Sequence, residues 1–138
     1  MVSNVEIKIV DSWNKDEIVN LYKAGGWWKK NYKSSGIKQL ISGSFAFAVG
    51  INNKKAIGMG RVISDSVSDA YIQDLVVLPE YRNRGIGEKI VRALIKCCKK
   101  KGIKWIGLIS EPNQDIFYKK IGFNIMENYV PMKYKEIE

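Results

Sequence analysis

The residues best suited to bind a ligand stand where an apolar run leads into a basic turn with two glycines. Leu75–Leu78 is continuously apolar, as in a strand covered on both faces, and Pro79, which lacks a backbone N–H, ends it. Gly85 and Gly87 then open a helix, where the absence of a Cβ lets backbone N–H groups turn toward an anion. The segment predicts a site for a phosphorylated ligand at the start of a helix that begins near Arg84.

Other phosphate-binding motifs fit this segment poorly. A dinucleotide-binding motif requires a third glycine where Ile90 stands, and a P-loop requires Gly-Lys-Ser/Thr, which the sequence lacks. On its spacing alone, Arg-x-x-Gly-x-Gly is equally compatible with an ordinary basic turn before a helix. The whole run Val77–Gly87, however, resembles the acetyl-CoA-binding motif of the GCN5-related N-acetyltransferases (GNAT), in which Arg/Gln-x-x-Gly-x-Gly/Ala follows a strand ending in Val-x-Pro-Glu-Tyr.

Three further stretches resemble the same family. Phe117–Phe123 is similar to its second CoA-side signature, Phe/Leu-Tyr-x-x-x-Gly-Phe, while Leu21–Trp27 and Ile57–Asp65 are similar to stretches of its small members. The resemblance implies a single N-acetyltransferase domain over residues 1–138. It also implies an α/β (mixed α+β) fold, the GNAT acyl-CoA N-acyltransferase fold, whose mostly antiparallel central sheet has splayed parallel strands 4 and 5 that admit the pantetheine arm.

The resemblance gives two residues catalytic roles. The Val77 N–H would polarise the thioester carbonyl and stabilise the oxyanion of a tetrahedral intermediate, and the Tyr118 phenol would protonate the departing CoA thiolate. A packed aromatic is the alternative for Tyr118. Glu111 replaces the asparagine that contacts pantetheine in many members, and Asn113 is the nearest asparagine. The residues expected to bind acetyl-CoA are Leu75, Val76, Val77, Arg82, Asn83, Arg84, Gly85, Ile86, Gly87, Glu88, Asn113, Phe117 and Tyr118.

The acceptor side of the site is expected around Trp27, Trp28 and Tyr32, between the first two helices, where this family forms its acceptor mouth. Packing is the alternative for these aromatic residues. Tyr71 and Gln73 are also expected on the acceptor side, because they occupy strand positions where several members carry Glu or His pointing into the site. Neither is a good base at neutral pH, so deprotonation of the amine is left to water.

Several acidic residues of the chain have no chemistry that the sequence can assign. Strand alternation is expected to turn Asp74 to the face opposite the site, as a structural residue. Arg61 and Asp65 are expected to pair structurally at the exit of a strand. Asp65, Asp69 and Glu111 stay open as bases, since the sequence does not place them relative to a bound amine.

The elements that must position these residues follow from periodicity and turn residues. Apolar alternation or continuous apolar runs predict strands at Glu6–Val10, Phe45–Ile51, Ala56–Ile63, Ala70–Leu78, Lys104–Ile109, Phe123–Met126 and Tyr129–Tyr134. Helical spacing predicts helices from near Asn14 to Gly25 and at Ile37–Gly43, Ile86–Cys98 and Gln114–Lys120. The fourth and fifth strands flank the long helix, which predicts a right-handed parallel crossover in an otherwise antiparallel sheet.

Composition limits the classes of function. A chain of 138 residues with 46% hydrophobic residues suits one packed domain, and the absence of histidine removes the commonest general base and metal ligand, so no metal is expected. No run approaches the roughly 18 apolar residues of a membrane span, and the N-terminus shows no leader pattern, which predicts a cytoplasmic protein with no membrane partner. The net charge of +9 favours polyanionic partners, such as CoA or nucleic acid.

Two classes of function follow. The leading hypothesis is an enzyme that moves the acetyl group of acetyl-CoA to a primary amine, on a small molecule or a peptide, by direct attack in a ternary complex. The alternative is a non-catalytic module that binds acyl-CoA or nucleic acid. No RNP-type, zinc-ligand or recognition-helix pattern accompanies the charge, which argues against nucleic acid, and the presence of Tyr118 argues against a pure sensor. Dimers are common in the family, so a homodimer is compatible with the resemblance.

Overall fold

The computed structural model describes residues 4–135 of a chain that divides into two compact units, Met1–Leu108 and Ile109–Glu138. The elements of the first unit are β1 (Glu6–Ile9), α1 (Lys15–Ala24), a 3₁₀ turn (Ser34–Gly36), α2 (Ile37–Gly43), β2 (Ala46–Asn52), β3 (Lys55–Ser64), β4 (Asp69–Val77), a second 3₁₀ turn (Pro79–Tyr81), α3 (Ile86–Lys100) and β5 (Trp105–Gly107). The second unit contains α4 (Asp115–Ile121).

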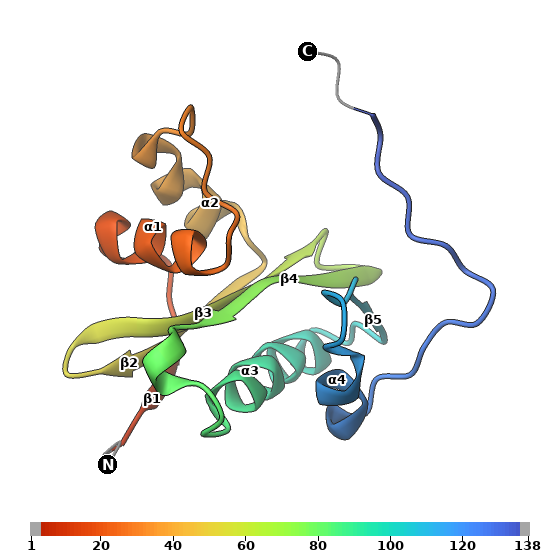
Figure 1. Cartoon of the computed structure of the whole chain (residues 1–138). Coiled ribbons are helices and arrows are strands. Elements are labelled where there is room, and N and C mark those ends of the chain that lie inside the picture. The colour runs from red at the N-terminus through yellow and green to blue at the C-terminus, as the bar shows by residue number, and fades with distance from the viewer. Residues whose placement is uncertain (1–3, 136–138) are drawn as a thin grey trace. The chain divides into compact units, whose positions relative to one another are not determined.

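The strands of the first unit form one mixed sheet in the order β1-β2-β3-β4-β5. Neighbouring strands are antiparallel except β4 and β5, which are parallel and are joined through α3. α1 and α2 lie on one face of this sheet and α3 lies on the other (Figure 1). This arrangement confirms the predicted mixed fold with a parallel β4–β5 pair. None of the helices in residues 4–135 is long and apolar enough to cross a membrane.

Local sequence accounts for the ends of these elements. The Asn14 side chain accepts a hydrogen bond from the Glu17 N–H at 3.0 Å and caps α1. Asn53 and Lys54 both adopt positive φ, at 50° and 66°, which gives the tight turn that the β2–β3 hairpin requires. The predicted start of α1 near Asn14 is therefore confirmed, and the two strands predicted at Phe45–Ile51 and Ala56–Ile63 are present as the hairpin β2–β3.

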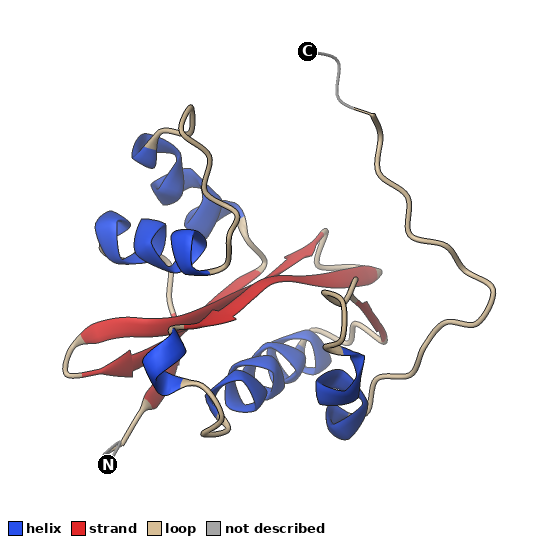
Figure 2. Cartoon of the chain, viewed as in Figure 1, coloured by secondary structure: helices blue, strands red, loops and turns tan. Residues whose placement is uncertain are grey.

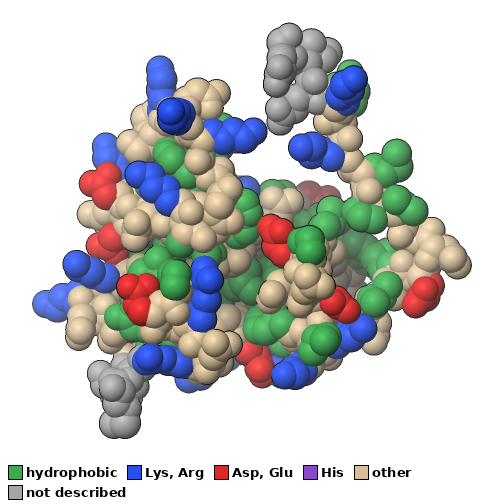
Figure 3. Space-filling view, in the orientation of Figure 1, with side chains coloured by type: hydrophobic (Ala, Val, Ile, Leu, Met, Phe, Trp, Pro, Cys, Tyr) green, Lys and Arg blue, Asp and Glu red, His purple; other side chains and the backbone are tan. Residues whose placement is uncertain are grey.

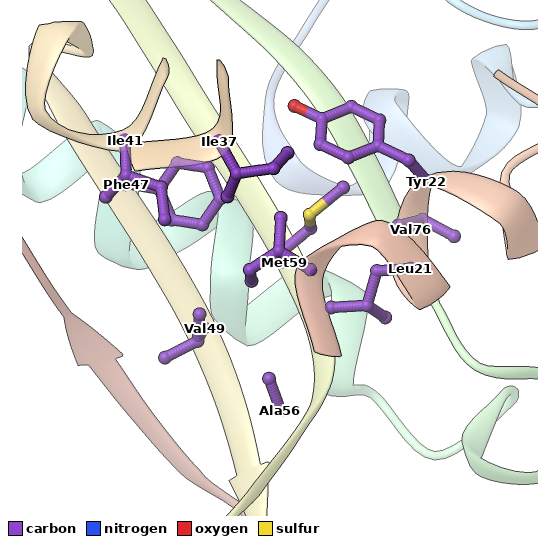
Figure 4. Packing of buried hydrophobic residues seen from close by; sticks show 10 residues of the cluster. Leu21, Tyr22, Ile37, Ile41, Phe47, Val49, Ala56, Met59 and Val76 are labelled. Atoms are coloured by element: carbon purple, nitrogen blue, oxygen red, sulfur yellow. The ribbon is translucent and has the colours of Figure 1, made fainter. Parts of the chain in front are cut away.

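The face of the sheet under α1 and α2 carries a compact apolar core (Figure 4). Met59 of β3 is fully buried there, among Leu21 of α1, Ile37 of α2 and Val76 of β4. Truncating a side chain in such a position to alanine costs roughly 2–5 kcal/mol of folding free energy, because a cavity adds to the lost apolar burial. This core fixes α1 against the strands that carry the candidate site.

The strands predicted at Phe123–Met126 and Tyr129–Tyr134 are wrong. After α4 the described chain continues as loop (Figure 2), and β5 is also shorter than predicted. Alternating apolar residues favour a strand only where a partner strand supplies hydrogen bonds, and the described part of the second unit contains no strand. Large apolar side chains are consequently left exposed, including Val130 at 75% and Met132 at 88%.

Candidate active site

The glycine turn forms an open helix N-terminus. Gly85 is the N-cap of α3 with φ of 79°, and the first intrahelical bond runs from the Lys89 N–H to the Gly85 carbonyl at 3.2 Å. The N–H groups of Ile86, Gly87 and Glu88 therefore have no acceptor within the helix, and no side chain caps them. Such a turn presents converging N–H groups and the positive end of the helix dipole to an anion. The predicted glycine turn at a helix N-terminus is present, although the helix begins two residues after Arg84.

The arginines of the motif take different positions. The Arg82 Nε donates to the Val77 carbonyl at 2.8 Å, which fastens the turn to the end of β4. The Arg84 guanidinium lies 6.0 Å from the centroid of the Tyr81 ring. Both arginine side chains are exposed, so their positive charges lie beside the open helix N-terminus and are accessible to a ligand. Asn83, between them, adopts φ of 63° and helps the chain reverse direction.

The last residues of β4 alternate in the direction of their peptide groups. The Leu78 N–H donates to the Ile57 carbonyl of β3 at 2.9 Å, and the register continues without a shift back through Val77 and Val76. Because alternate residues of an antiparallel pair exchange hydrogen bonds, the peptide groups of Val76 face β3 and those of Val77 face away. β5 pairs only with Asp69–Tyr71, so β5 does not cover β4 where the Val77 N–H points outward.

A β-bulge interrupts β4 just before this end. Two residues of β4, Asp74 and Leu75, stand opposite the single residue Gly60 of β3. Asp74 has φ of 59°, a left-handed conformation that few residues with a side chain adopt. An extra residue shifts the alternation of everything after it by one position. Asp74, as the extra residue, therefore has its side chain on the face that carries α1, the same face as Gln73. The prediction that Asp74 faces away from the site is wrong for this reason.

Two donors converge on the Asp74 carboxylate. The Tyr22 hydroxyl of α1 donates to Oδ2 at 2.7 Å, and the Arg61 Nε of β3 donates to the same oxygen at 2.6 Å. Burial, together with the negative charge of Asp74, raises the pKa of the Tyr22 phenol well above its usual value, so Tyr22 stays a donor. Arg61 thus pairs with Asp74. The predicted pair of Arg61 with Asp65 is wrong.

Asp65 has a different and local role. Its carboxylate accepts the backbone N–H groups of Ser68 and Val67 at 2.9 and 2.8 Å, which orders the β3–β4 connection. These hydrogen bonds, that of Ser68 first, lower the pKa of Asp65. Asp65 and Asp69 lie at the end of β4 farthest from Val77. At about 3.3 Å per residue, eight residues of strand separate Asp69 from Val77 by roughly 25 Å, so neither acid reaches a group bound at Val77.

The predicted acceptor aromatics gather around Tyr22. α1 ends in a Schellman motif, in which left-handed Gly26 lets the Trp27 N–H donate to the Tyr22 carbonyl at 3.0 Å. The same motif brings the Trp27 ring against the Tyr22 ring, with centroids 6.2 Å apart. Trp28 also contacts Tyr22, at 6.3 Å, and Tyr32 contacts Trp28 at 5.6 Å. Trp27, Trp28 and Tyr32 therefore form one cluster, which Tyr22 links to Asp74.

Within residues 4–135, no ring contact or side-chain hydrogen bond links Tyr71 or Gln73 to the cluster of Trp27, Trp28 and Tyr32. Tyr71 stands opposite Gly107 on β5 and its ring lies 5.2 Å from that of Trp105. It is six residues before Val77, roughly 20 Å along a strand. Gln73 is closer and, being opposite Arg61, has its side chain on the face that carries α1.

The second unit holds Tyr118 in a fixed aromatic setting. α4 also ends in a Schellman motif, with Gly122 at φ of 118° and the Phe123 N–H donating to the Tyr118 carbonyl at 3.1 Å. The Tyr118 ring contacts those of Phe117 and Phe123 edge-on, at 4.9 and 5.9 Å. The Phe-Tyr-x-x-x-Gly-Phe signature is therefore a helix stop that orients one tyrosine. The two phenylalanines are half-buried.

The chemistry of Tyr118 suits a proton donor. Partial burial, and then the negative charge of Glu111, raise the pKa of the Tyr118 phenol above its usual value. The phenol therefore keeps its proton at neutral pH, as a general acid must. Asn113 adopts φ of 67° in the turn that precedes α4.

Sequence reasoning missed the network of Tyr22, Arg61 and Asp74. The available signal was an acidic residue directly before the apolar run Leu75–Leu78, of a type that tolerates a left-handed backbone better than most. Among residues 4–135 no group of three or more His, Cys, Asp or Glu side chains is arranged to hold a metal ion. Lys and Arg side chains are scattered over the face seen in Figure 3, with Asp and Glu among them.

Comparison with known proteins places this geometry in context. The family model described as an acetyltransferase (GNAT) domain matches residues 43–125. An uncharacterized N-acetyltransferase of Pyropia yezoensis, ycf52, is 33% identical over 118 residues, which cover 80% of this chain and 64% of that relative. The chain thus spans less than two thirds of the length of that relative.

Solved structures share the fold over nearly the whole chain. A GNAT family acetyltransferase from Streptococcus pneumoniae TIGR4 matches with a TM-score of 0.82 and 24% identity, covering 98% of this chain and 100% of that one. AAC(6')-Iy, in complex with the bisubstrate analog CoA-S-monomethyl-acetylneamine, matches with a TM-score of 0.75 and 18% identity, covering 96% and 99%. At these identities the likeness concerns the fold alone.

Proposed function

Because the chain belongs to the GNAT acetyltransferase family, we propose that it transfers the acetyl group of acetyl-CoA to a primary amine by direct attack in a ternary complex. One observation carries the proposal. The open helix N-terminus at Gly85 follows directly on a strand end whose Val77 N–H is turned away from its neighbouring strand. A candidate phosphate grip and a carbonyl-polarising donor are thus only eight residues apart in the chain, and an acyl-CoA thioester has phosphates for the first and a carbonyl for the second.

Acetyl-CoA binding is assigned mainly to the backbone. The N–H groups of Ile86, Gly87 and Glu88 hold the pyrophosphate, and Arg82 and Arg84 add positive charge beside it. The other proposed contacts are Leu75, Val76, Val77, Asn83, Gly85, Asn113, Phe117 and Tyr118. The CoA-containing bisubstrate analog in AAC(6')-Iy supports the fold's suitability for this ligand. No metal ion is part of the proposed reaction.

The proposed reaction proceeds without an acetylated enzyme. The ammonium form of the acceptor loses a proton to water, and its neutral nitrogen attacks the thioester carbon. The carbonyl oxygen becomes an oxyanion that the Val77 N–H stabilises, and the nitrogen, now positively charged, gives a second proton to water before the intermediate collapses. The C–S bond then breaks, the electron pair leaves with sulfur, and Tyr118 gives its proton to the thiolate. Solvent returns a proton to the phenolate. The raised pKa of Tyr118 supports this direction of proton transfer.

The acceptor is proposed to be a small-molecule or peptide amine with an apolar or aromatic body. The supporting observation is the cluster of Trp27, Trp28 and Tyr32, of which Tyr32 is 45% exposed. Aromatic faces that remain accessible offer stacking area to such a body. Tyr71 and Gln73 stay proposed contacts for parts of the acceptor that are farther from the reacting nitrogen.

We also propose that the protein forms a homodimer. The described residues after α4 expose apolar side chains at alternate positions, Val130, Met132 and Tyr134, with fractions of 75%, 88% and 83%. Exposed apolar segments with strand-forming alternation tend to pair with another chain. A second copy of this chain supplies the matching surface in a symmetric assembly.

The proposed location of the protein is the cytoplasm, which cell fractionation tests.

One assay separates the enzyme from a non-catalytic binding module. Purified protein is mixed with acetyl-CoA and each of a panel of primary amines, and free thiol and acetylated amine are measured together. The proposal expects both products in equal amounts, and only when amine and protein are present. Tight acetyl-CoA binding without either product would favour the sensor, and absence of binding would refute the site.

A further inference from the structure

The bulge in β4 decides which peptide N–H faces the uncovered side of that strand. Before the bulge, Gln73 stands opposite Arg61. If that register continued to the end of the strand, Val77 would stand opposite Ile57 and its N–H would donate to β3. The extra residue instead places Leu78 opposite Ile57, where their hydrogen bond is observed at 2.9 Å, and the Val77 N–H turns outward.

We propose that Asp74 is a positioning residue for acyl transfer, which holds this bulge and thereby directs the Val77 N–H at the thioester carbonyl. The inference rests on the proposed function and adds to it a residue that determines where the oxyanion donor points. Asp74 needs no contact with the substrates in this role.

The contacts of Asp74 explain how one side chain can hold the bulge. Its Oδ2 accepts hydrogen bonds from Tyr22 on α1 and from Arg61 on β3, at 2.7 and 2.6 Å. Tyr22 is itself fixed, because it is 7% exposed and packs in the core with Val76, which follows the bulge. The two donors therefore come from two elements on either side of the bulge. Their convergence favours the left-handed backbone of Asp74 over the extended one.

A second packing observation supports the same register. A Cβ built on Gly60 would lie 3.4 Å from a methyl group of Leu75 and 3.0 Å from one of Ile90 on α3. Leu75 therefore lies on the α3 face, while Asp74 lies on the α1 face. Without the bulge these two side chains would exchange faces, which would place the carboxylate against α3 and leave Tyr22 and Arg61 without their acceptor.

The rival role for Asp74 is that of a base that takes the proton of the amine. The two roles differ in what asparagine can replace. Asparagine tolerates the left-handed conformation, and its amide oxygen accepts the same two hydrogen bonds, but it takes up no proton at neutral pH. Alanine does neither, since it disfavours positive φ and accepts no hydrogen bond through its side chain.

The first test measures the bulge directly, by NMR amide hydrogen exchange on the protein without substrates. In the parent protein the Val76 amide, bonded to β3, should exchange at least ~10-fold more slowly than that of Val77. Asp74→Asn should keep this order, and Asp74→Ala should reverse it as the register slips. An unchanged order in Asp74→Ala would show that other contacts hold the bulge and would overturn the proposal.

The second test measures turnover and CoA binding on the same variants, with the amine that the panel identifies. Asp74→Ala should lower kcat by roughly 10²-fold, the usual effect of losing one oxyanion donor, while the Kd for CoA changes by less than ~3-fold. Asp74→Asn should lose less than ~5-fold in kcat, because the bulge persists. Asp69→Ala, on the same strand, is the control and should match the parent.

The outcomes separate this inference from the proposed function. An Asp74→Asn variant that keeps the parent exchange order but is as slow as Asp74→Ala would make Asp74 a direct participant in proton transfer and overturn the positioning role. A parent protein that transfers no acetyl group would refute the proposed function, and this inference with it. An active parent whose Asp74→Ala variant keeps both its exchange order and its kcat would refute the inference alone.

Discussion

Replacing Gly85 by alanine should weaken CoA binding about 5- to 30-fold through the backbone alone. Gly85 has φ of 79°, where an L-residue with a Cβ costs about 1–2 kcal/mol more than glycine. No heavy atom lies within 4 Å of a Cβ built there, so the methyl group of alanine would clash with no other residue of the protein. The free turn can relax this strain and the ligand-bound turn cannot, so the cost appears in binding, where every 1.4 kcal/mol is tenfold.

The assay is calorimetric titration with CoA, paired with thermal unfolding of each variant. Gly36→Ala is the matched control, since Gly36 is also a helix N-cap with an open Cβ position but has φ of −79°, and its CoA affinity should equal that of the parent. Gly85→Asn separates two causes: it should recover most of the affinity if backbone strain dominates, and none if a Cβ blocks the phosphate. Parent-like CoA binding by both Gly85→Ala and Gly85→Val would refute the assigned phosphate site.

The remaining predictions concern Tyr118, nucleic acid and self-association. Tyr118→Phe keeps the ring contacts and removes the hydroxyl, so kcat should fall roughly 10²- to 10⁴-fold with little change in CoA affinity. The loss of kcat should be smaller for acyl donors whose leaving thiol is more acidic. An unchanged kcat, measured where chemistry limits the rate, would show that Tyr118 is only a packing residue. Since a raised pKa keeps the phenol protonated, kcat should not decline through Tyr118 below about pH 10, and a decline near neutrality that Tyr118→Phe abolishes would contradict this. Random duplex DNA should bind no tighter than a Kd of about 10⁻⁶ M at physiological salt, as a competition assay can show, because sequence-independent phosphate contacts alone give Kd values of roughly 10⁻⁴ to 10⁻⁶ M. Light scattering should show a dimer for the parent and a monomer when Val130 and Met132 are both changed to Lys, whereas a monomeric parent would remove the homodimer proposal.

Where local chemistry alone decides the structure, the sequence was sufficient. Asn14 predicts the start of α1 because its side chain can cap the helix, and Asn53, which lies between two predicted strands, tolerates the positive φ that their connection adopts. The Gly85 turn was likewise predictable, since few other residues allow φ of 79° before a helix. In each case the relevant interaction spans fewer than five residues.

Where partners distant in sequence decide, prediction failed. The bulge at Asp74 depends on Tyr22 and Arg61, and alternation along a single strand gives no sign of a register shift against its neighbour. The segment after α4 has strand-like alternation at Val130 and Met132, yet strand formation needs a pairing edge that its own sequence does not contain. The apolar exposure that results was visible only in the structure.

The most direct test of the central claim follows the acetyl group itself. Acetyl-CoA labelled with ¹³C at the carbonyl is incubated first with the protein alone and then with the panel of primary amines, and intact protein and amines are analysed by mass spectrometry. We expect no acetylated protein in the first step, followed by labelled acetyl-amine and free CoA in equal amounts, and neither product with Gly85→Val. Acetyl transfer to the protein before amine is added, or no labelled product with any amine, would contradict it.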